Sequence, residues 1–186
     1  MSYNSTIQQE MKIIWTGFFI SLLSTCFKTK EKTQDKFLIT FQVNIFEHQP
    51  YCGGALPSKE QEKGSYLVLQ DHVFLIKRGI INNDSIPIIK EIVTDQNGMF
   101  QTQLPSGTYG LIFPAKHQSF NKFYEIKSKE SLHLKAGSRS CFEKWWRTPD
   151  ALIQITDTTR HVKAIIKSKC NTGFNPCLVY TGPKRP

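Results

Sequence analysis

The fold of this chain is indicated by one stretch of sequence, Thr94-Asp95-Gln96-Asn97-Gly98-Met99-Phe100, and by its continuation, Leu104-Pro105-Ser106-Gly107-Thr108-Tyr109 to Leu111. Asn-Gly between apolar runs is a strong signal for a hairpin turn, because both residue types adopt positive φ at low cost. We therefore expect Asn97-Gly98 to join a strand that ends at Ile92-Val93 to a strand that contains Phe100.

The residues after this turn alternate in the manner of a strand with one buried face. Phe100, Thr102 and Leu104 share a face, because successive side chains of a strand point to opposite sides. Pro105-Ser106-Gly107 breaks this strand, and a second alternating run follows. Turns at this spacing are typical of the short strands of a β-sandwich, and an arbitrary hairpin in another β protein is the alternative. One sandwich core is expected to bury Phe100, Leu104, Tyr109 and Leu111.

The pattern T-D-x-N-G-x-F, followed by L-P-x-G-T-Y-x-L, resembles the carboxypeptidase regulatory-like domain over roughly residues 37–113. This resemblance implies an all-β fold, a transthyretin-like antiparallel β-sandwich of about seven to nine strands. The chain also resembles one-domain lipoproteins of Bacteroidetes-type bacteria through residues 51–55 (YCGGA) and a tail with Lys169-Cys170, Pro176-Cys177 and residues 180–183. Together the resemblances imply a fold and a surface location, and no catalytic residue is carried over.

The amino-terminal region predicts export. An apolar run over residues 13–23 is short for a membrane span and has the length of a signal-peptide core. Leu23-Ser24-Thr25-Cys26 ends the run and resembles a lipobox, in which the cysteine is lipidated, although Thr25 departs from the usual small residue. We expect a signal peptide over residues 1–25, with Met11 as the better start because Lys12 follows it. An ordinary secretory signal and a retained membrane helix are the alternatives.

The rest of the chain divides into a tether and one domain. Residues 26–36 are expected to form the lipid anchor and a flexible tether, since residues 28–36 are polar and lack apolar side chains. Residues 37–186 have the length of a single domain and are expected to form one sandwich with an ordered carboxy-terminal tail. Lipid on Cys26 would hold the protein to a membrane of the cell envelope, facing the periplasm or the cell surface.

The cysteines support this location. Five cysteines, less the predicted anchor, leave an even number, which indicates two disulfides in an exported domain. All three connectivities are open, and the expected pairs are Cys170 with Cys177 and Cys52 with Cys141. A metal site that combines cysteines with His48 is the alternative. The spacing of the last two cysteines is, however, wider than the two to about four residues of a zinc knuckle.

An aromatic segment supplies the candidate ligand-binding residues. If it is extended, Trp145 and Trp146 point to opposite faces, and one of them is exposed. An exposed tryptophan beside Arg147 can stack on a sugar or contact a protein. Tyr51, in a turn-rich insertion, is a further candidate. The alternatives are that both tryptophans pack against the tail, and that the Tyr51 segment packs around a disulfide.

The remaining apolar runs also predict β-structure. Residues 124–135 are expected to form short strands. Residues 152–155 and 162–166 flank a polar turn and are expected to form a final hairpin. No long helix is expected anywhere in the domain.

Charge and motifs limit the classes of function. The net charge of +9 and the pI of 9.3 come from lysines scattered along the chain, which indicates a solvated basic surface or attraction to anionic envelope polymers and lipid headgroups. Nucleic acid is not expected as a partner of an exported chain without a binding motif.

The motif search leads to the predicted function. Hydrolase, phosphate-loop, HExxH and Rossmann motifs are absent from the sequence, so we predict no enzyme, no cofactor and no metal. The predicted function is a non-catalytic binding or structural module on an envelope lipoprotein, whose partners are membrane lipid and an envelope glycan or protein. The alternatives are carbohydrate or peptidoglycan binding through Trp145 and Trp146, and metal binding through the Cys/His set.

Overall fold

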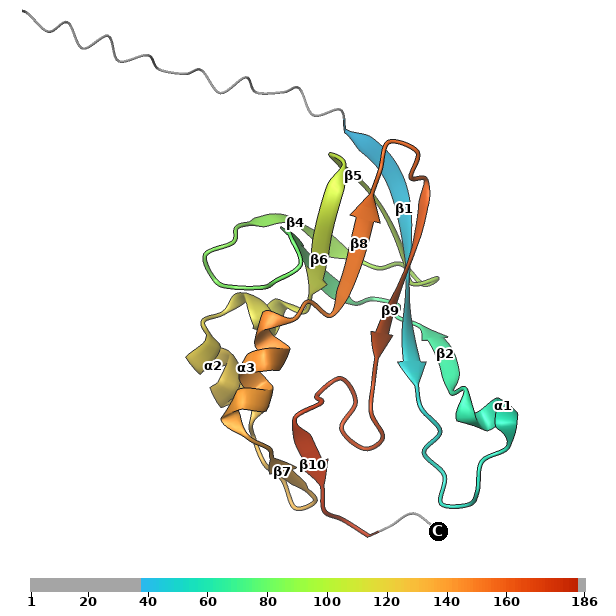
Figure 1. Ribbon diagram of the computed structural model, residues 1–186, viewed down its shortest axis with the longest axis vertical. Coiled ribbons are helices and arrows are strands. Elements are labelled where there is room, and N and C mark those ends of the chain that lie inside the picture. Colours follow the sequence, from blue (N-terminus) through green and yellow to red (C-terminus); the bar gives the residue numbers. More distant parts are fainter. Residues whose placement is uncertain (1–37, 184–186) are drawn as a thin grey trace, which may run out of the picture. The chain divides into compact units, whose positions relative to one another are not determined.

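Residues 38–183 are the part of the chain that the computed structural model describes (Figure 1). They form two four-stranded sheets, a two-stranded ribbon and several short helices. The predicted signal peptide, Cys26 and the tether up to residue 36 lie outside the described residues. Within residues 38–183, no helix has the length and apolar character needed to cross a membrane.

The first sheet is built around one long strand. Its members are β1 (Ile39–Gln49), β2 (Ser65–Val68), β5 (Met99–Leu104) and β9 (His161–Lys167). Strand β5 pairs antiparallel with the first half of β1 and β2 with its second half. Strand β9 runs parallel to β1 and overlaps both of these stretches, so it occupies the other edge of β1 (Figure 1). Along β1, Phe41, Val43 and Ile45 are buried and alternate with more exposed residues.

The second sheet is antiparallel throughout and has the order β4-β3-β6-β8. Its strands are β3 (Val73–Arg78), β4 (Ile88–Val93), β6 (Gly107–Ile112) and β8 (Ala151–Ile155). The apolar inner faces of the two sheets share one core. The predicted all-β sandwich is therefore confirmed, and this core contains the four expected residues, Phe100, Leu104, Tyr109 and Leu111.

Two connections that we expected to be hairpins instead cross from one sheet to the other. The turn at Asn97-Gly98 leads from β4, which pairs with β3, to β5, which pairs with β1. The turn after residue 155 likewise leads from β8 in the second sheet to β9 in the first. Local alternation predicts which side chains of a strand face inward. It does not predict the partner strand, because both sheets present an apolar face to the same core.

Two segments expected to be extended contain helices. The described helices are α1 (Lys59–Glu62), η1 (Pro114–His117), α2 (Phe120–Lys127) and α3 (Arg139–Arg147). The expectation of short strands over residues 124–135 is wrong for its first part, which belongs to α2. The expectation of an extended segment around Trp145 is also wrong. Ser138 caps α3, its hydroxyl accepting a hydrogen bond from the Cys141 nitrogen at 3.2 Å.

The two longer helices pack on each other beside the sandwich (Figure 1). Strands β7 (Leu134–Ala136) and β10 (Leu178–Tyr180) pair to form a ribbon next to them. We call η1, α2, α3 and this ribbon the helical cap. The cap has its own small core, formed by Phe123, Phe142, Trp146 and Cys177.

All four cysteines of the domain are paired, but the expected pairs are wrong. The disulfides join Cys52 to Cys170 and Cys141 to Cys177. The parallel pairing of β1 with β9 explains the first, because it places the segments that follow these two strands side by side. The first turn of α3 lies against the ribbon, where the nitrogen of Gly137 donates to the carbonyl oxygen of Cys177 at 2.8 Å, and this contact explains the second.

Candidate ligand-binding groove

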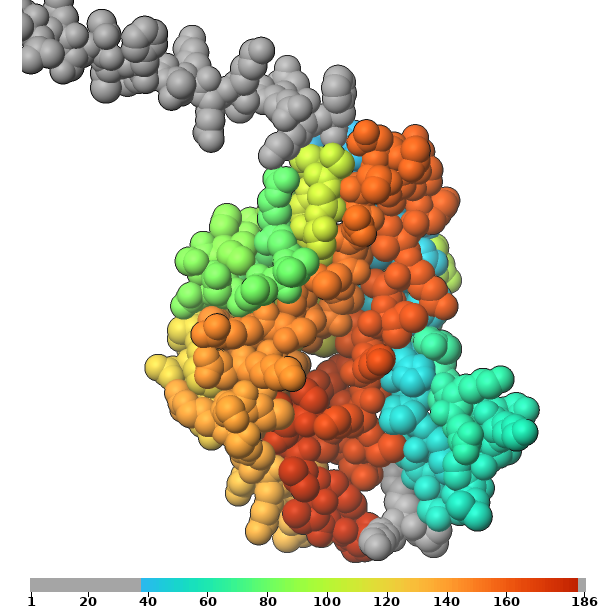
Figure 2. Space-filling view, in the orientation of Figure 1, coloured from blue at the N-terminus to red at the C-terminus, as the bar shows by residue number. Residues whose placement is uncertain are grey.

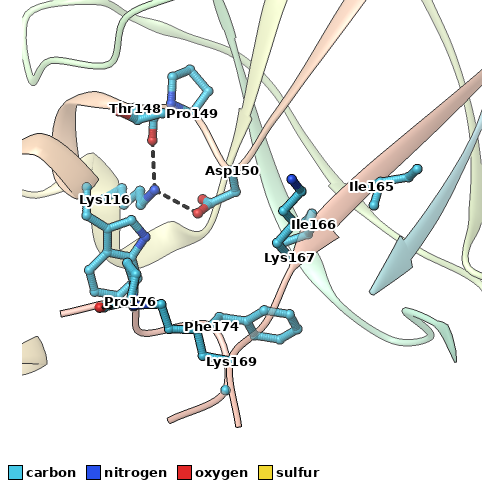
Figure 3. Close-up of a pocket in the computed structure, with 12 residues that line it drawn as sticks. Lys116, Thr148, Pro149, Asp150, Ile165, Ile166, Lys167, Lys169, Phe174 and Pro176 are labelled. Carbon is cyan, nitrogen blue, oxygen red and sulfur yellow. Dashed lines mark hydrogen bonds and ion pairs between the residues drawn. The ribbon is translucent and has the colours of Figure 1, made fainter. Parts of the chain in front are cut away.

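Two adjoining cavities lie between the helical cap, the end of β9 and the tail segment that follows it. Their volumes are about 320 and 450 Å³, and Lys116, Trp145 and Phe174 line both of them. We call the two cavities together the Trp145 groove. Figure 2 shows the surface hollowed where the orange segment that includes α3 meets the dark red tail, and Figure 3 shows the residues of the smaller cavity.

Aromatic rings form the walls of the groove. Trp145, on the partly exposed side of α3, packs edge-on against Phe123 with ring centroids 5.0 Å apart. Phe174 comes from the loop between β9 and β10 and packs against Phe113, with ring centroids 5.2 Å apart. His72 completes this wall, 6.4 Å from Phe174. Rings contributed by α3, by the carboxy-terminal loop and by the end of the second sheet therefore face one space.

A buried ion pair supports the floor of the smaller cavity. The ammonium of Lys116 lies 2.7 Å from a carboxylate oxygen of Asp150, and their side chains are only 1% and 5% exposed. The Lys116 ammonium also donates to the carbonyl oxygen of Thr148 at 2.8 Å (Figure 3). The second oxygen of Asp150 accepts a hydrogen bond from the nitrogen of Phe113 at 2.8 Å. Burial lowers the pKa of Lys116, and the charge of Asp150 partly opposes that effect.

The rim of the groove is cationic. Lys167 and Lys169 line the smaller cavity, and Lys127 lines the larger one. Among the residues that line either cavity, Asp150 is the only acid, and it is paired with Lys116. The ammonium of Lys169 donates to the carbonyl oxygen of Pro176 at 2.8 Å. The groove thus combines an aromatic surface with an excess of positive charge.

One hydroxyl in the larger cavity is unsatisfied. The oxygen of the Thr172 side chain is shielded from solvent and has no hydrogen-bond partner among the described residues. A buried polar atom without a partner is unfavourable, so a ligand that offered a donor or acceptor to this hydroxyl would gain from it.

Of the ligand-binding residues that the sequence suggested, only Trp145 lies in the groove. Trp146 is 7% exposed, and its indole nitrogen donates to the carbonyl oxygen of Gln118 at 3.0 Å, so it packs inside the helical cap. Arg147 is exposed and pairs with Glu143 at 3.0 Å. Tyr51 lines a separate cavity beside Cys52. The alternative was that both tryptophans pack against the tail, and both belong to the cluster that contains Cys177 of the tail, with Trp146 buried and Trp145 partly buried.

Sequence reasoning missed the residues that complete the groove with Trp145. Lys116 is a buried lysine, and lysine is rarely buried unless it is paired, so composition gives no hint of it. Phe174 and Phe113 are far apart in the chain and meet only in the folded domain. The spacing of Phe142 and Trp146, four residues apart beyond a serine, did carry a signal for a helix.

The groove offers aromatic rings, lysine ammonium groups and a hydroxyl to a ligand. The four cysteines are held in disulfides. Over residues 38–183, no cluster of three His, Cys, Asp or Glu side chains has the arrangement of a metal site. Comparison of the chain with models of protein families, with curated proteins and with solved structures finds no match.

Proposed function

We propose that the protein is a non-catalytic carbohydrate-binding module of the cell envelope, and that the Trp145 groove holds a sugar that carries an acidic group. The observation that carries this proposal is the combination of Trp145 and Phe174 with unpaired positive charge at the rim. Flat apolar faces of sugar rings pack on aromatic side chains, and lysine ammonium groups bind carboxylates. A cavity of this size is within the range, about 300–1,000 Å³, of small-molecule sites.

The groove favours an acidic sugar over a neutral one. Asp150 is neutralised by Lys116, which leaves the charges of Lys127, Lys167 and Lys169 without an acidic partner among the described residues. The N-acetylmuramic acid of peptidoglycan, wherever its lactyl carboxyl is not amide-linked to a peptide, has both features that the groove would bind, a sugar ring and a carboxylate. The transthyretin-like relationship and the lipid anchor at Cys26 belong to the same proposal, since an anchored module would meet this polymer in the envelope.

An NMR titration with two related sugars tests the groove. N-Acetylmuramic acid differs from N-acetylglucosamine by its lactyl ether, which adds a carboxylate. We expect the acidic sugar to bind more tightly, and Trp145→Ala to weaken the binding of both. Lys167→Gln should reduce the difference in affinity between the two sugars, because it removes a positive charge from the rim.

The matched control for this titration is Arg147→Ala, which removes an exposed cation on the same helix but outside the groove. It should leave both affinities unchanged. Equal affinity for the two sugars, or unchanged binding in Trp145→Ala, would contradict the proposal.

A further inference from the structure

Apart from the Trp145 groove, the outward face of the first sheet also has the properties of a binding surface. We call it the outer β1 face: the side chains of β1, β2, β5 and β9 that alternate with those buried in the core. None of them is buried within the described part of the chain. The only acidic residue of the four strands is Glu47, and by alternation it points to the opposite side. The outer β1 face is therefore free of negative side chains.

One end of this face combines cations with aromatic rings. The ammonium of Lys163 lies 4.8 Å from the ring centroid of Phe46 and 5.0 Å from that of Tyr66. The ring of His48 lies 5.0 Å from the same tyrosine, which is 53% exposed. Neither Lys163 nor Lys167 has an ion-pair partner among the described residues. Their charges are thus available to an anionic partner.

Next to this cluster is a row of uncharged polar groups, in which Asn44 of β1 lies directly beside Lys163 of β9. Gln42 of β1 lies opposite Gln101 of β5, and Asn44 follows on the same side of β1. The side chains of Asn44 and Gln101 make no hydrogen bond within residues 38–183. An amide offers donors and an acceptor together, which suits a partner that is rich in hydroxyl groups.

We propose that the outer β1 face binds an extended anionic polysaccharide that lies along β1. This site shares Lys167 with the rim of the Trp145 groove and otherwise consists of different residues, and it goes beyond the proposed function because the partner is a polymer. The aromatic rings would contact sugar faces, the amides would bind hydroxyl groups, and Lys163 and Lys167 would pair with acidic groups of the chain.

The spacing of the charges favours this partner over nucleic acid. Lys163 and Lys167 are four residues apart on one strand, which corresponds to about 13 Å. A DNA duplex presents a negative charge about every 1.7 Å along its axis, which is far denser. A lipid surface would pair with the lysines but would leave the row of amides without partners. A polysaccharide with widely spaced acidic groups satisfies both sets of residues.

The test measures binding of the purified full chain to immobilised polygalacturonate, with dextran as a neutral polymer of similar length. We expect polygalacturonate to bind and dextran to bind at least about tenfold more weakly, with the difference shrinking as salt is added. Lys163→Glu and, independently, Tyr66→Ala should each weaken binding several-fold. Lys163 is chosen because Lys167 also lines the Trp145 groove.

Two controls make the result specific. Lys135→Glu introduces the same charge change on the exposed side of β7, and it should retain the affinity of the wild type. The second control titrates Tyr66→Ala with N-acetylmuramic acid: Tyr66 lies outside the Trp145 groove, so binding of this sugar should be unchanged, and failure of the groove proposal is distinguishable from failure of this one. Thermal melts establish that the variants are folded.

Other outcomes would overturn the inference. These are equal binding to dextran, unchanged binding in both Lys163→Glu and Tyr66→Ala, and tighter binding to duplex DNA or to phosphatidylglycerol vesicles than to polygalacturonate. The first outcome would show that charge does not govern binding, the second that the site lies elsewhere, and the third that the partner belongs to another chemical class.

Discussion

At the scale of single residues, Gly98 is the critical position in the turn that leads from β4 in the second sheet to β5 in the first. Gly98 has a φ of +67°, and a Cβ there would come to 2.8 Å from the carbonyl oxygen of Ile45. The side chain of Asp95 accepts hydrogen bonds from the nitrogens of Asn97 and Met99, both at 2.8 Å. The turn is therefore held by an aspartate and closed by a glycine. Asn97 itself does not have the positive φ that we expected of it.

We predict that Gly98→Val destabilises the domain by more than the roughly 1–3 kcal/mol usually associated with a strained backbone, because the side chain also meets β1. Gly173→Val is the matched control. Gly173 also has positive φ, at +57°, but nothing lies within 4 Å of the position that a Cβ would take there. Urea unfolding should show the larger loss for Gly98→Val, and equal losses would contradict the close contact with β1.

The ion pair beneath the groove gives a second prediction. Lys116→Met should lower the free energy of unfolding by about 3–5 kcal/mol, because it leaves the carboxylate of Asp150 buried without its cation. Adding Asp150→Asn should recover much of the loss. Arg147→Met, which breaks an exposed pair, should cost at most about 1 kcal/mol. Similar losses for the buried and the exposed pair, measured by urea unfolding, would show that burial of the pair has no energetic consequence.

Tyr109 gives a prediction about pH. Burial raises the pKa of its hydroxyl above 10.0, partly offset by Arg78, and the hydroxyl donates to the carbonyl oxygen of Pro105 at 2.7 Å. Above the unfolded-state value the folded state holds more protons, so stability falls as pH rises through the raised pKa. Urea unfolding across pH 9 to about 11 should show this fall, and Tyr109→Phe should reduce it. An identical slope in the variant would contradict the assignment.

At the scale of elements, the position of Trp145 depends on how α3 is held. The helix is joined to the tail by the disulfide between Cys141 and Cys177, and Phe142 and Trp146 anchor it in the core of the helical cap. Phe174, the opposite wall of the groove, belongs to the loop that leads to the same cysteine. The disulfide therefore joins the two segments that carry the opposite walls of the groove.

We predict that Cys141→Ser combined with Cys177→Ser costs about 2–5 kcal/mol of stability and weakens sugar binding in the Trp145 groove. Hydrogen exchange should become faster in α3 than in β1. The paired control is Cys52→Ser with Cys170→Ser, which removes the disulfide beyond β1 and β9. This control should also reduce the stability of the domain, but it should weaken sugar binding less. A stronger loss of sugar binding in the control would indicate that the sugar binds near Cys52 and Cys170 and not in the Trp145 groove.

At the scale of the whole molecule, one domain presents two surfaces of different shape. The Trp145 groove is a cavity that we propose to bind a single acidic sugar, whereas the outer β1 face is the exposed side of a sheet that we propose to bind a polymer. Both have excess positive charge, in keeping with the net charge of +9. The envelope location was predicted from the apolar run over residues 13–23 and the lipobox-like segment that ends at Cys26. Anionic polymers are partners that such a location would offer.

The location itself is tested through Cys26. With the leader intact, Cys26→Ser should move the protein from the membrane fraction to the soluble fraction, because the lipid anchor would be lost. Cell fractionation followed by immunoblotting measures this. Cys52→Ser serves as the control, since it removes a cysteine without touching the predicted lipobox. Unchanged membrane association of the Cys26 variant would refute the lipid anchor.

The sequence by itself determined two kinds of property: those that follow from the alternation of side chains along a strand, and those that follow from the number of cysteines. Alternation along residues 100–111 identified a β-sandwich and its buried residues, because burial in a strand follows a period of two. The even number of cysteines after Cys26 predicted that all four in the domain would be paired. Trp145 was identified as a candidate from its residue type alone.

Only the tertiary structure decided what depends on contacts between distant segments. It assigned β4 and β5 to different sheets, although both present an apolar side to the same core. It paired Cys52 with Cys170, because β9 runs parallel to β1, and no local pattern reveals that alignment. It also buried Lys116 against Asp150 beneath Trp145. Burial of a charge becomes favourable only when a partner from another element arrives, so the groove is a property of the assembled fold.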